Sequence, residues 1–334
     1  MSNMTNPPAG TTLGSQSHFH FSTVPGIFLQ DEETTDPDIF DYVSSNFGLI
    51  TRPYPSDTDA EHDDQDQKKP LSQWERLSFF IQTLNRTSDP STSYKLLFLG
   101  RHGQGVHNVA ETKYGTILWD CHYSLLNGDA NGTWFDAPLT TLGIAQAQTA
   151  HDAWKTQIRH GIPAPESYYV SPLTRCCETA KVTFDGTGLP GTTPFTPLIK
   201  ELLRETIGLH SCDSRSPKSV IEKAFPEYKF EEGFREEDEL YSAELRESNS
   251  ARDARFFEFL SDIFGTDGNT FLSLTAHSGA ITSMLNVVGH RVFTLETGGV
   301  IPVLVKAEKR EGRAPERVVE PWFRKPECPR ESGL

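Results

Sequence analysis

The stretch Lys95-Leu-Leu-Phe-Leu-Gly-Arg-His-Gly-Gln-Gly-Val-His-Asn108 decides the fold of this chain. Its apolar run at residues 96–99 is typical of a buried strand, and Gly100 ends that run. Arg101 and His102 follow directly, so the strand delivers a cation and a nucleophile at its carboxyl end. In open α/β sheets, ligands bind at this end of the strands. A single Arg-His pair is common in proteins, and the prediction of a site therefore depends on distant segments that agree with it.

Three further predicted strands also lead to a polar side chain. They comprise residues 166–170, 198–203 and 269–275. The polar residues that follow them are Arg175, Glu205 and His277. Each of these residues alone could be a solvent-exposed surface group or a structural residue. Their recurrence at the ends of successive strands favours one common site.

Apolar residues at helical spacing predict helices between the strands. The predicted helices comprise residues 144–158, 176–183, 252–264 and 281–288. A chain in which strands and helices alternate favours a parallel sheet with its strand ends at one edge. We therefore expect an α/β fold, a three-layer sandwich with a mostly parallel central sheet flanked by helices. A last strand is expected at residues 303–306, and residues 109–131 are too irregular to assign to an element.

Composition divides the chain into four parts. These are a disordered N-terminus, an N-terminal extension, a main domain and a C-terminal tail, at residues 1–25, 26–93, 94–310 and 311–334 respectively. Ser, Thr, Asn, Gly and Pro dominate the first part, which is typical of disorder. In the extension, apolar and aromatic residues at 28–50 predict packing on the main domain, and residues 55–70 predict an acidic surface loop. Ser72 and Glu75 predict a capping box that begins a helix.

The 334-residue chain carries a net charge of −15, which argues against nucleic acid or an anionic membrane as its partner. No window approaches the roughly 18 apolar residues that a membrane span needs, and the N-terminus lacks a secretory signal pattern. The five cysteines show no Cys-x-x-Cys spacing of the kind found in metal or redox motifs. We therefore expect a soluble protein of the cytoplasm, or also of the nucleus. The sequence indicates no oligomeric state.

The residues at the strand ends form a set that suits phosphoryl transfer. Arginines can neutralise phosphoryl oxygens, because the transition state needs mainly positioning and charge stabilisation. An unprotonated imidazole can attack phosphorus and hold it covalently. A carboxyl group can protonate the leaving oxygen and then take a proton from water. No metal-ligand spacing accompanies this set, so we expect no metal and no other cofactor, with arginines in place of a cation.

Residues 99–108 resemble the Arg-His-Gly signature of the histidine phosphatase superfamily, the phosphoglycerate mutase-like proteins. Three later segments are similar to its other motifs and occur in the same order: Ser171-Pro-Leu-Thr-Arg175, Glu205 and Thr275-Ala-His-Ser-Gly279. Ordered matches of this kind are far more specific than one short motif. The resemblance covers residues 94–306 and implies the phosphoglycerate mutase-like fold, with residues 94–310 as the catalytic domain. Residues 204–213 further resemble a fungal and plant group of phosphatase-like members.

The resemblance implies a role for each residue of the set. His102 would be phosphorylated in the intermediate, and Glu205 would be the proton donor. The phosphoryl group would be bound by Arg101, Arg175 and His277. Further contacts to a small phosphorylated substrate are expected from Asn108, Gln104, Gly105, His107 and Ser278.

Departures from the family pattern favour hydrolysis of a phosphomonoester, or a diphosphate, of a small metabolite. Gln104 and Gly105 stand where glycolytic mutases carry Glu-Ser, and His107 replaces their Trp. The Arg-His-Gly-x-Arg-x-Pro pattern of acid phosphatases and phytases is absent as well. A phosphomutase and a non-catalytic phospho-ligand-binding protein are the alternatives, although a non-catalytic member would usually lack part of the set. Residues 109–135 and 209–247 are expected to select the substrate.

Overall fold

The computed structural model describes residues 17–58, 70–189 and 195–329. Within these ranges the chain forms a seven-stranded sheet with the order β1-β9-β2-β8-β5-β6-β7 and a separate β3–β4 hairpin. The strands are β1 (Ser17–Thr23), β2 (Thr92–Arg101), β3 (Gly128–Asp129), β4 (Gly132–Thr133), β5 (Ser167–Val170), β6 (Leu198–Ile199), β7 (Lys229–Phe230), β8 (Phe271–Ala276) and β9 (Val300–Glu311). In the large sheet, antiparallel pairing is confined to β9 and its two neighbours, so the sheet is mostly parallel, as the sequence predicts.

The parallel register brings the carboxyl ends of β2, β8 and β5 to one edge of the sheet. Thr275 in β8 lies opposite both Gly100 in β2 and Val170 in β5. Each of the three strands ends within one residue of these positions, and the backbone N–H of His102 still donates to the carbonyl of Ala276, 3.0 Å away. The ends of the three central strands therefore emerge side by side.

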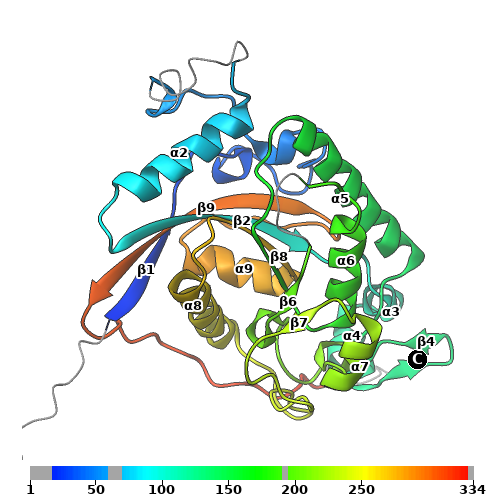
Figure 1. Cartoon of the computed structure of the whole chain (residues 1–334). Coiled ribbons are helices and arrows are strands. Elements are labelled where there is room, and N and C mark those ends of the chain that lie inside the picture. The colour runs from blue at the N-terminus through cyan, green and yellow to red at the C-terminus, as the bar shows by residue number, and fades with distance from the viewer. Residues whose placement is uncertain (1–16, 59–69, 190–194, 330–334) are drawn as a thin grey trace, which may run out of the picture.

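Helices cover both faces of this sheet. The α-helices of the described residues are α2 (Gln73–Thr87), α3 (Val106–Tyr114), α4 (Thr116–Cys121), α5 (Thr141–Arg159), α6 (Thr174–Phe184), α7 (Lys218–Ala224), α8 (Asn249–Thr266) and α9 (Ser278–Val287). Figure 1 shows α2 and α5 on one side of the sheet and α8 and α9 on the other. Nowhere in the described ranges is a helix both long enough and apolar enough to cross a membrane.

Alternate residues of β2 pack into two different cores. Leu97 and Leu99 belong to a cluster with apolar residues of α8 and α9. Leu96 and Phe98 belong to a second cluster with residues of α2, α5 and α6. Each fully buried side chain of this size contributes about 2 kcal/mol to folding. Because both faces of the strand are buried, its sequence is a continuous apolar run, and the predicted three-layer sandwich is confirmed.

Side-chain caps begin two of the helices, and the capping box predicted at Ser72 and Glu75 is present. The Ser72 side chain accepts a hydrogen bond from the backbone of Glu75, and the Glu75 carboxylate accepts one from the backbone of Ser72 at 2.6 Å. At the start of α5, the Thr140 hydroxyl accepts from the backbone of Gly143 at 3.1 Å. These caps satisfy donors that the first helical turn leaves free.

Residues 109–131 are more regular than their sequence indicates. Most of them belong to α3, α4 and the β3–β4 hairpin, and Gly115, with a φ of 77°, separates the two helices. Trp119 packs against Trp134, which lies after the hairpin, with 5.6 Å between the ring centroids. This small cluster lies apart from the two main cores, and its packing stabilises helices that local polarity does not predict.

The N-terminal expectation is wrong for residues 17–25. Residues 17–23 form β1, which pairs with β9 along its whole length, because β9 offers an unpaired edge. Residues 1–16 and most of the predicted acidic loop, residues 59–69, lie outside the described residues. Further along the extension, Phe28 and Phe47 are completely buried in the core that contains α2 and α5. The extension thus supplies both an edge strand and core residues to the main sheet.

The predicted strand at residues 198–203 is wrong in its second half. Only Leu198–Ile199 pair in the sheet, and Glu201–Leu203 form a short 3₁₀ helix. The Glu201 carboxylate accepts hydrogen bonds from Arg204 and Arg215 at 2.9–3.0 Å. These ion pairs turn the backbone away from the sheet before the segment that contains Glu205.

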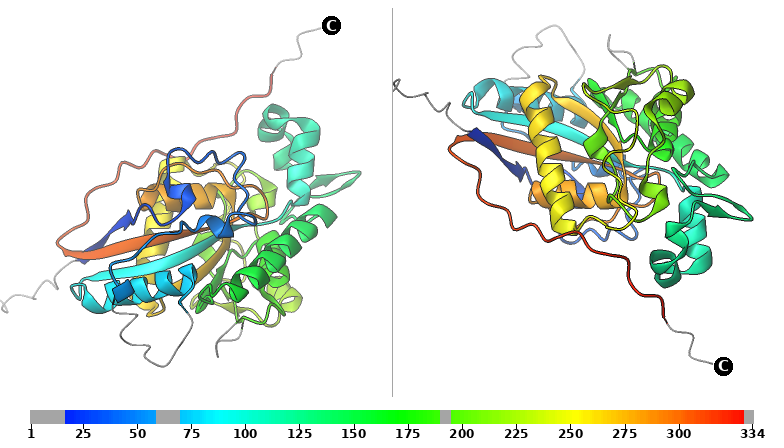
Figure 2. Two further views of the ribbon diagram at one scale, coloured as in Figure 1. Left: turned by 90° about the horizontal axis from the view of Figure 1, so that it is seen from above. Right: turned by 90° about the horizontal axis from the view of Figure 1, so that it is seen from below.

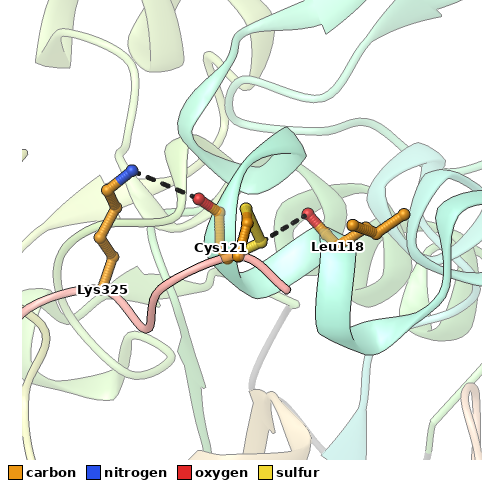
Figure 3. The surroundings of a disulfide bond; sticks show 4 residues. Leu118, Cys121 and Lys325 are labelled. Atoms are coloured by element: carbon orange, nitrogen blue, oxygen red, sulfur yellow. Dashed lines mark hydrogen bonds between the residues drawn. A yellow bond between two sulfur atoms is a disulfide. The ribbon is translucent and has the colours of Figure 1, made fainter. Parts of the chain in front are cut away.

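A disulfide between Cys121 in α4 and Cys328 fastens the C-terminal tail to the domain, and its surroundings are shown in Figure 3. After β9 the tail runs along the outside of the molecule (Figure 2). The backbone of Phe323 pairs with that of Arg246 at 2.8 and 3.0 Å, and Lys325 Nζ donates to the carbonyl of Cys121 at 3.4 Å. The two cysteines are 207 residues apart, a separation that no spacing motif covers.

Reduction of this disulfide is expected to release the tail while the sheet stays folded, because neither main core contains a tail residue. Limited proteolysis with and without a thiol reductant, read by mass spectrometry, checks this. Cleavage within residues 313–327 should require the reductant, whereas the Cys328→Ser variant should be cleaved in either condition. A tail that stays protected in this variant would show that its other contacts suffice to hold it.

Candidate active site

His102 lies at the carboxyl end of β2, and its side chain is 3% exposed. Its Nδ1 is 2.7 Å from the carbonyl oxygen of Gly103. Because a carbonyl can only accept a hydrogen bond, Nδ1 carries the proton and Nε2 has a free lone pair. Burial, and then the charge of Arg175, hold the pKa of His102 well below its usual value. The imidazole is therefore neutral at physiological pH, the state that a nucleophile requires.

Two further imidazoles lie beside His102. The ring centroids of His277 and His107 are 5.1 and 5.5 Å from that of His102. The Nε2 atom of His277 is 2.8 Å from the hydroxyl oxygen of Ser171, whereas the buried Nδ1 atom of His107 has no hydrogen-bond partner in the described protein. Burial and the charge of Arg175 lower the pKa of both rings well below the usual value. All three rings are thus neutral and can contact an anion.

Arg101 and Arg175 supply the positive charge of the site. Arg101 donates from Nη1 to the carbonyl of Leu295 at 2.7 Å. Arg175, which is 1% exposed, donates from Nη1 to the carbonyl of Cys212 at 2.6 Å and from Nη2 to Asp213 at 3.0 Å. The Nε atom of each arginine is buried and has no partner among the described residues. Buried donors are nearly always hydrogen-bonded, so these two nitrogens are suited to an anionic ligand.

Asp213 holds Arg175 in place. Its second carboxylate oxygen accepts from Arg246 at 3.2 Å. Burial opposes ionisation of this carboxyl group, but Arg246 and Arg175 together lower the pKa of Asp213 below its usual value. The carboxylate is therefore charged and orients the guanidinium group that faces the three imidazoles.

The same carboxylate belongs to the one group of potential metal ligands found among the described residues. His210, Cys212 and Asp213 each have a ligand atom within 4.8 Å of the others. Both oxygens of Asp213, however, are bound by arginines, and burial raises the pKa of the Cys212 thiol well above its usual value. A neutral thiol and a neutralised carboxylate suit the positioning of Arg175 better than they suit a cation.

Glu205 lies against the start of α9. Its Oε2 accepts from the backbone N–H of Gly279 at 3.0 Å, and its Oε1 accepts from the backbone and hydroxyl of Thr206 at 2.8 and 3.1 Å. A Cβ atom on Gly279 would lie 2.2 Å from Oε1, so only glycine allows the carboxylate this close. The backbone carbonyl of Glu205 accepts from Arg255 at 3.0 Å, which fixes its position.

The other expected substrate-binding residues lie in the loop after β2, in the first turn of α3 or at the start of α9. Gly105 donates from its backbone to Asn108 Oδ1 at 2.9 Å, and Thr140 donates to Gln104 Oε1 at 2.8 Å. The amide oxygens of both side chains are thus used to shape the loop, which leaves their NH₂ groups as donors. His107 lies in the first turn of α3, and Ser278 is the half-buried first residue of α9. Their contacts to a substrate stay predictions.

Sequence reasoning missed three residues that shape the site. Asp213 lies within residues 204–213, the segment that resembles the fungal and plant group, and a buried partner for Arg175 could have been sought there. Ser171 lies directly before the Pro-Leu-Thr-Arg segment. Arg252 had no such signal, because it reaches the site from within α8, where its neighbours are ordinary helix residues.

A family model described as histidine phosphatase superfamily (branch 1) matches residues 97–292, which is more than half of the chain. The match contains the carboxyl ends of β2, β5 and β8 and the residues described above. The chain therefore belongs to the histidine phosphatase superfamily. The superfamily comprises phosphatases and mutases, enzymes that transfer the phosphoryl groups of small phosphorylated compounds.

Individual proteins similar to this chain are named for both activities. A protein of Arthroderma benhamiae named "Probable phosphoglycerate mutase" is 52% identical over 288 residues, which cover 86% of this chain and 84% of that protein. "Phosphomutase-like protein 3" of Candida albicans is 40% identical over 222 residues, which cover 66% of this chain and 68% of that protein. The structure of the ecdysone phosphate phosphatase from Bombix mori in complex with tungstate is 18% identical with a TM-score of 0.37, and covers 72% of this chain and 95% of that one.

Asp213→Asn is expected to lower the free energy of unfolding by about 3 kcal/mol, because it leaves two guanidinium groups without their buried counter-charge. Urea unfolding followed by fluorescence measures this. Glu227→Gln is the matched control, since Glu227 pairs with Lys181 at 2.7 Å on the surface and exposed pairs contribute about 0–1 kcal/mol. Equal losses in the two variants would contradict the assigned role of Asp213.

Stability is expected to fall as the pH drops below about 6.5. Burial lowers the pKa values of His102, His107 and His277, and it lowers the pKa of His210 to about 4. In this window the unfolded chain binds protons that the folded chain does not, so acid favours unfolding by up to about 1.4 kcal/mol per pH unit for each histidine. Urea unfolding across pH 7 to about 5 tests the slope, and His107→Gln should reduce it. A stability that is flat in this range would contradict neutral buried imidazoles.

Proposed function

We propose that the protein is a metal-independent phosphatase that hydrolyses a phosphomonoester or diphosphate of a small metabolite through a phosphohistidine at His102. The observation that carries the proposal is the state of this residue. Its Nδ1 proton is donated to the Gly103 carbonyl, and its pKa is lowered by burial, so Nε2 is a free nucleophile. Arg101 and Arg175, each with a buried Nε donor that has no protein partner in the described ranges, support a phosphoryl site next to it.

The reaction has two steps. In the first, Nε2 of His102 attacks phosphorus, an N–P bond forms and the P–O bond to the leaving group breaks. Glu205, protonated at this stage, gives its proton to the leaving oxygen. In the second, water attacks phosphorus, the N–P bond breaks, and Glu205 accepts a proton from the water. The two arginines and His277 stabilise the charge on the phosphoryl oxygens in both steps.

A phosphomutase is the second candidate, and the names of the relatives favour it. A mutase returns the phosphoryl group to another hydroxyl group and must keep water out while it does so. Gln104, Gly105 and His107 differ from the residues of glycolytic mutases, which supports hydrolysis instead. A non-catalytic phospho-ligand-binding protein is disfavoured, because the chain keeps all five reacting residues.

The predicted cytoplasmic or nuclear location stays a proposal. The disulfide between Cys121 and Cys328 argues against a permanently reducing compartment, because such bonds persist mainly in oxidising ones.

Phosphate release from a panel of phosphomonoesters in excess chelator tests the proposal. His102→Ala should abolish release, and Glu205→Gln should lower it by about 100- to 10,000-fold for alkyl esters. The loss in Glu205→Gln should be much smaller for p-nitrophenyl phosphate, whose leaving group needs no proton. His151→Asn, which alters a buried histidine bonded to Thr183 far along α5, is the matched folding control.

Isotope-labelled water separates the two catalytic candidates. Label in the released phosphate supports hydrolysis, whereas a rearranged phosphoester without label supports a mutase. Retention of wild-type release by His102→Ala would overturn the phosphohistidine route in both.

A further inference from the structure

A cavity of about 410 Å³ opens between α4, the segment after Glu205, the start of α8 and the C-terminal tail. Three arginines line it: Arg246, Arg252 and Arg324. Arg324 belongs to the tail and Arg252 to α8, so distant parts of the chain meet around this space. Neither step of the proposed reaction takes place in this cavity.

The cavity lies next to the proposed proton donor. Thr206, which lines it, donates from its hydroxyl to Glu205 Oε1 at 3.1 Å and accepts from Arg252 Nη1 at 2.6 Å. A Cβ atom on Gly279 would lie 2.2 Å from Glu205 Oε1 and 2.8 Å from Arg252 Nη1, so both atoms reach the same point at the start of α9. Since Glu205 gives its proton to the leaving oxygen, the cavity lies on the side that the leaving group occupies.

Arg252 is a buried cation with no acidic partner. Its side chain is 8% exposed, and its hydrogen bonds go to two neutral hydroxyl groups, Thr206 Oγ1 and Ser283 Oγ at 2.6 and 2.9 Å. It forms no ion pair with the residues that the structure describes. The Glu205 carboxylate comes near the same point beside Gly279 but forms no ion pair with Arg252, so this guanidinium group can still accept an anionic ligand.

Two carboxylates, Asp120 and Glu247, line the cavity beside its three arginines. Glu247 is already bound through both oxygens by Arg255, at 2.8 and 2.6 Å. Asp120 is the other carboxylate at the cavity; burial raises its pKa, and the charge of Arg246 opposes that shift. The exposed Arg324 forms no hydrogen bond or ion pair within the described ranges. In a protein with a net charge of −15, this concentration of positive charge is a local exception.

We propose that this cavity is a second phosphate subsite, which binds a phosphate group carried by the leaving group of the substrate. The substrate class is then a bisphosphate of a small metabolite. This inference rests on the proposed phosphatase function. It adds the requirement that the substrate carry a second phosphate group, which the phosphoryl site at His102 does not impose. A phosphate group carries about −1.5 to −2 charges and three acceptor oxygens, so a cavity lined by three arginines suits it better than a single carboxylate.

The disulfide holds one wall of this subsite. Cys328 lies four residues beyond Arg324, and Phe323 is fixed by its backbone pairing with Arg246. Lys325 binds the carbonyl of Cys121 between these two points, as Figure 3 shows. Reduction by a dithiol transfers two electrons and two protons to the disulfide and gives two thiols, which frees the segment that carries Arg324.

Three substrates of equal chain length test the subsite: an alkanediol bisphosphate, the monophosphate of the same diol and the corresponding phosphooxy carboxylic acid. The bisphosphate should have a kcat/KM at least ~10-fold above the monophosphate, as expected for one charge-assisted contact. Arg324→Ala should lower this ratio by about 10-fold and Arg324→Lys by less. Arg313→Ala, an exposed tail arginine outside the cavity, is the matched control and should leave the ratio unchanged. Dithiol treatment and Cys328→Ser should lower the ratio in the same way as Arg324→Ala.

Equilibrium binding separates this proposal from the proposed function. Calorimetric titration of the His102→Ala protein with the bisphosphate needs no turnover, and addition of Arg324→Ala should weaken binding by about 10-fold. If no ester is hydrolysed but this loss is observed, the proposed function fails and the subsite stands. Any one of three results would overturn the second phosphate subsite. The first is equal kcat/KM values for the bisphosphate and the monophosphate, and the second is a ratio of these values that Arg324→Ala leaves unchanged. The third is a kcat/KM for the phosphooxy carboxylic acid as high as that for the bisphosphate.

Discussion

The buried ion pair between Arg175 and Asp213 is the interaction on which the rest of the site depends. Arg175 is the second cause, after burial, of the low pKa values of His102, His107 and His277. Its own orientation depends on Asp213, which a second arginine also binds. Buried pairs of this kind add little net stability. Their value lies in a fixed positive charge that keeps the neighbouring imidazoles neutral and that suits an anion.

The central sheet could be predicted, and the candidate site residues could be proposed, because each depends on a local signal. The strand at residues 96–99 is apolar on both faces, and Arg101 and His102 follow it in the chain. Features made by long-range contacts had no such signal. Residues 17–23 look disordered because their partner β9 lies nearly 300 residues later, and residues 109–131 look irregular because their core is a small separate cluster.

The parts of the site that sequence reasoning missed share the same cause. In the sequence, Asp213 and Arg252 look like ordinary charged residues, because only folding buries them. Cys121 and Cys328 can be recognised as partners only once the tail is seen to reach α4. In the candidate site, His102 and His277 directly follow the strands β2 and β8, whereas the cavity beside Glu205 is built from a helix, a loop and the tail. The first can therefore be shared across a superfamily, while the second is free to differ between members.

Gly279 gives a simple criterion for interpreting related sequences. Its missing side chain is what allows the Glu205 carboxylate to reach the start of α9, since a methyl group there would overlap Oε1. A homologue that keeps the histidines, the arginines and the glutamate but carries alanine at this position would look intact by its motifs. The carboxylate that corresponds to Glu205 would nevertheless be displaced in it, so the two sites would differ although their motifs agree.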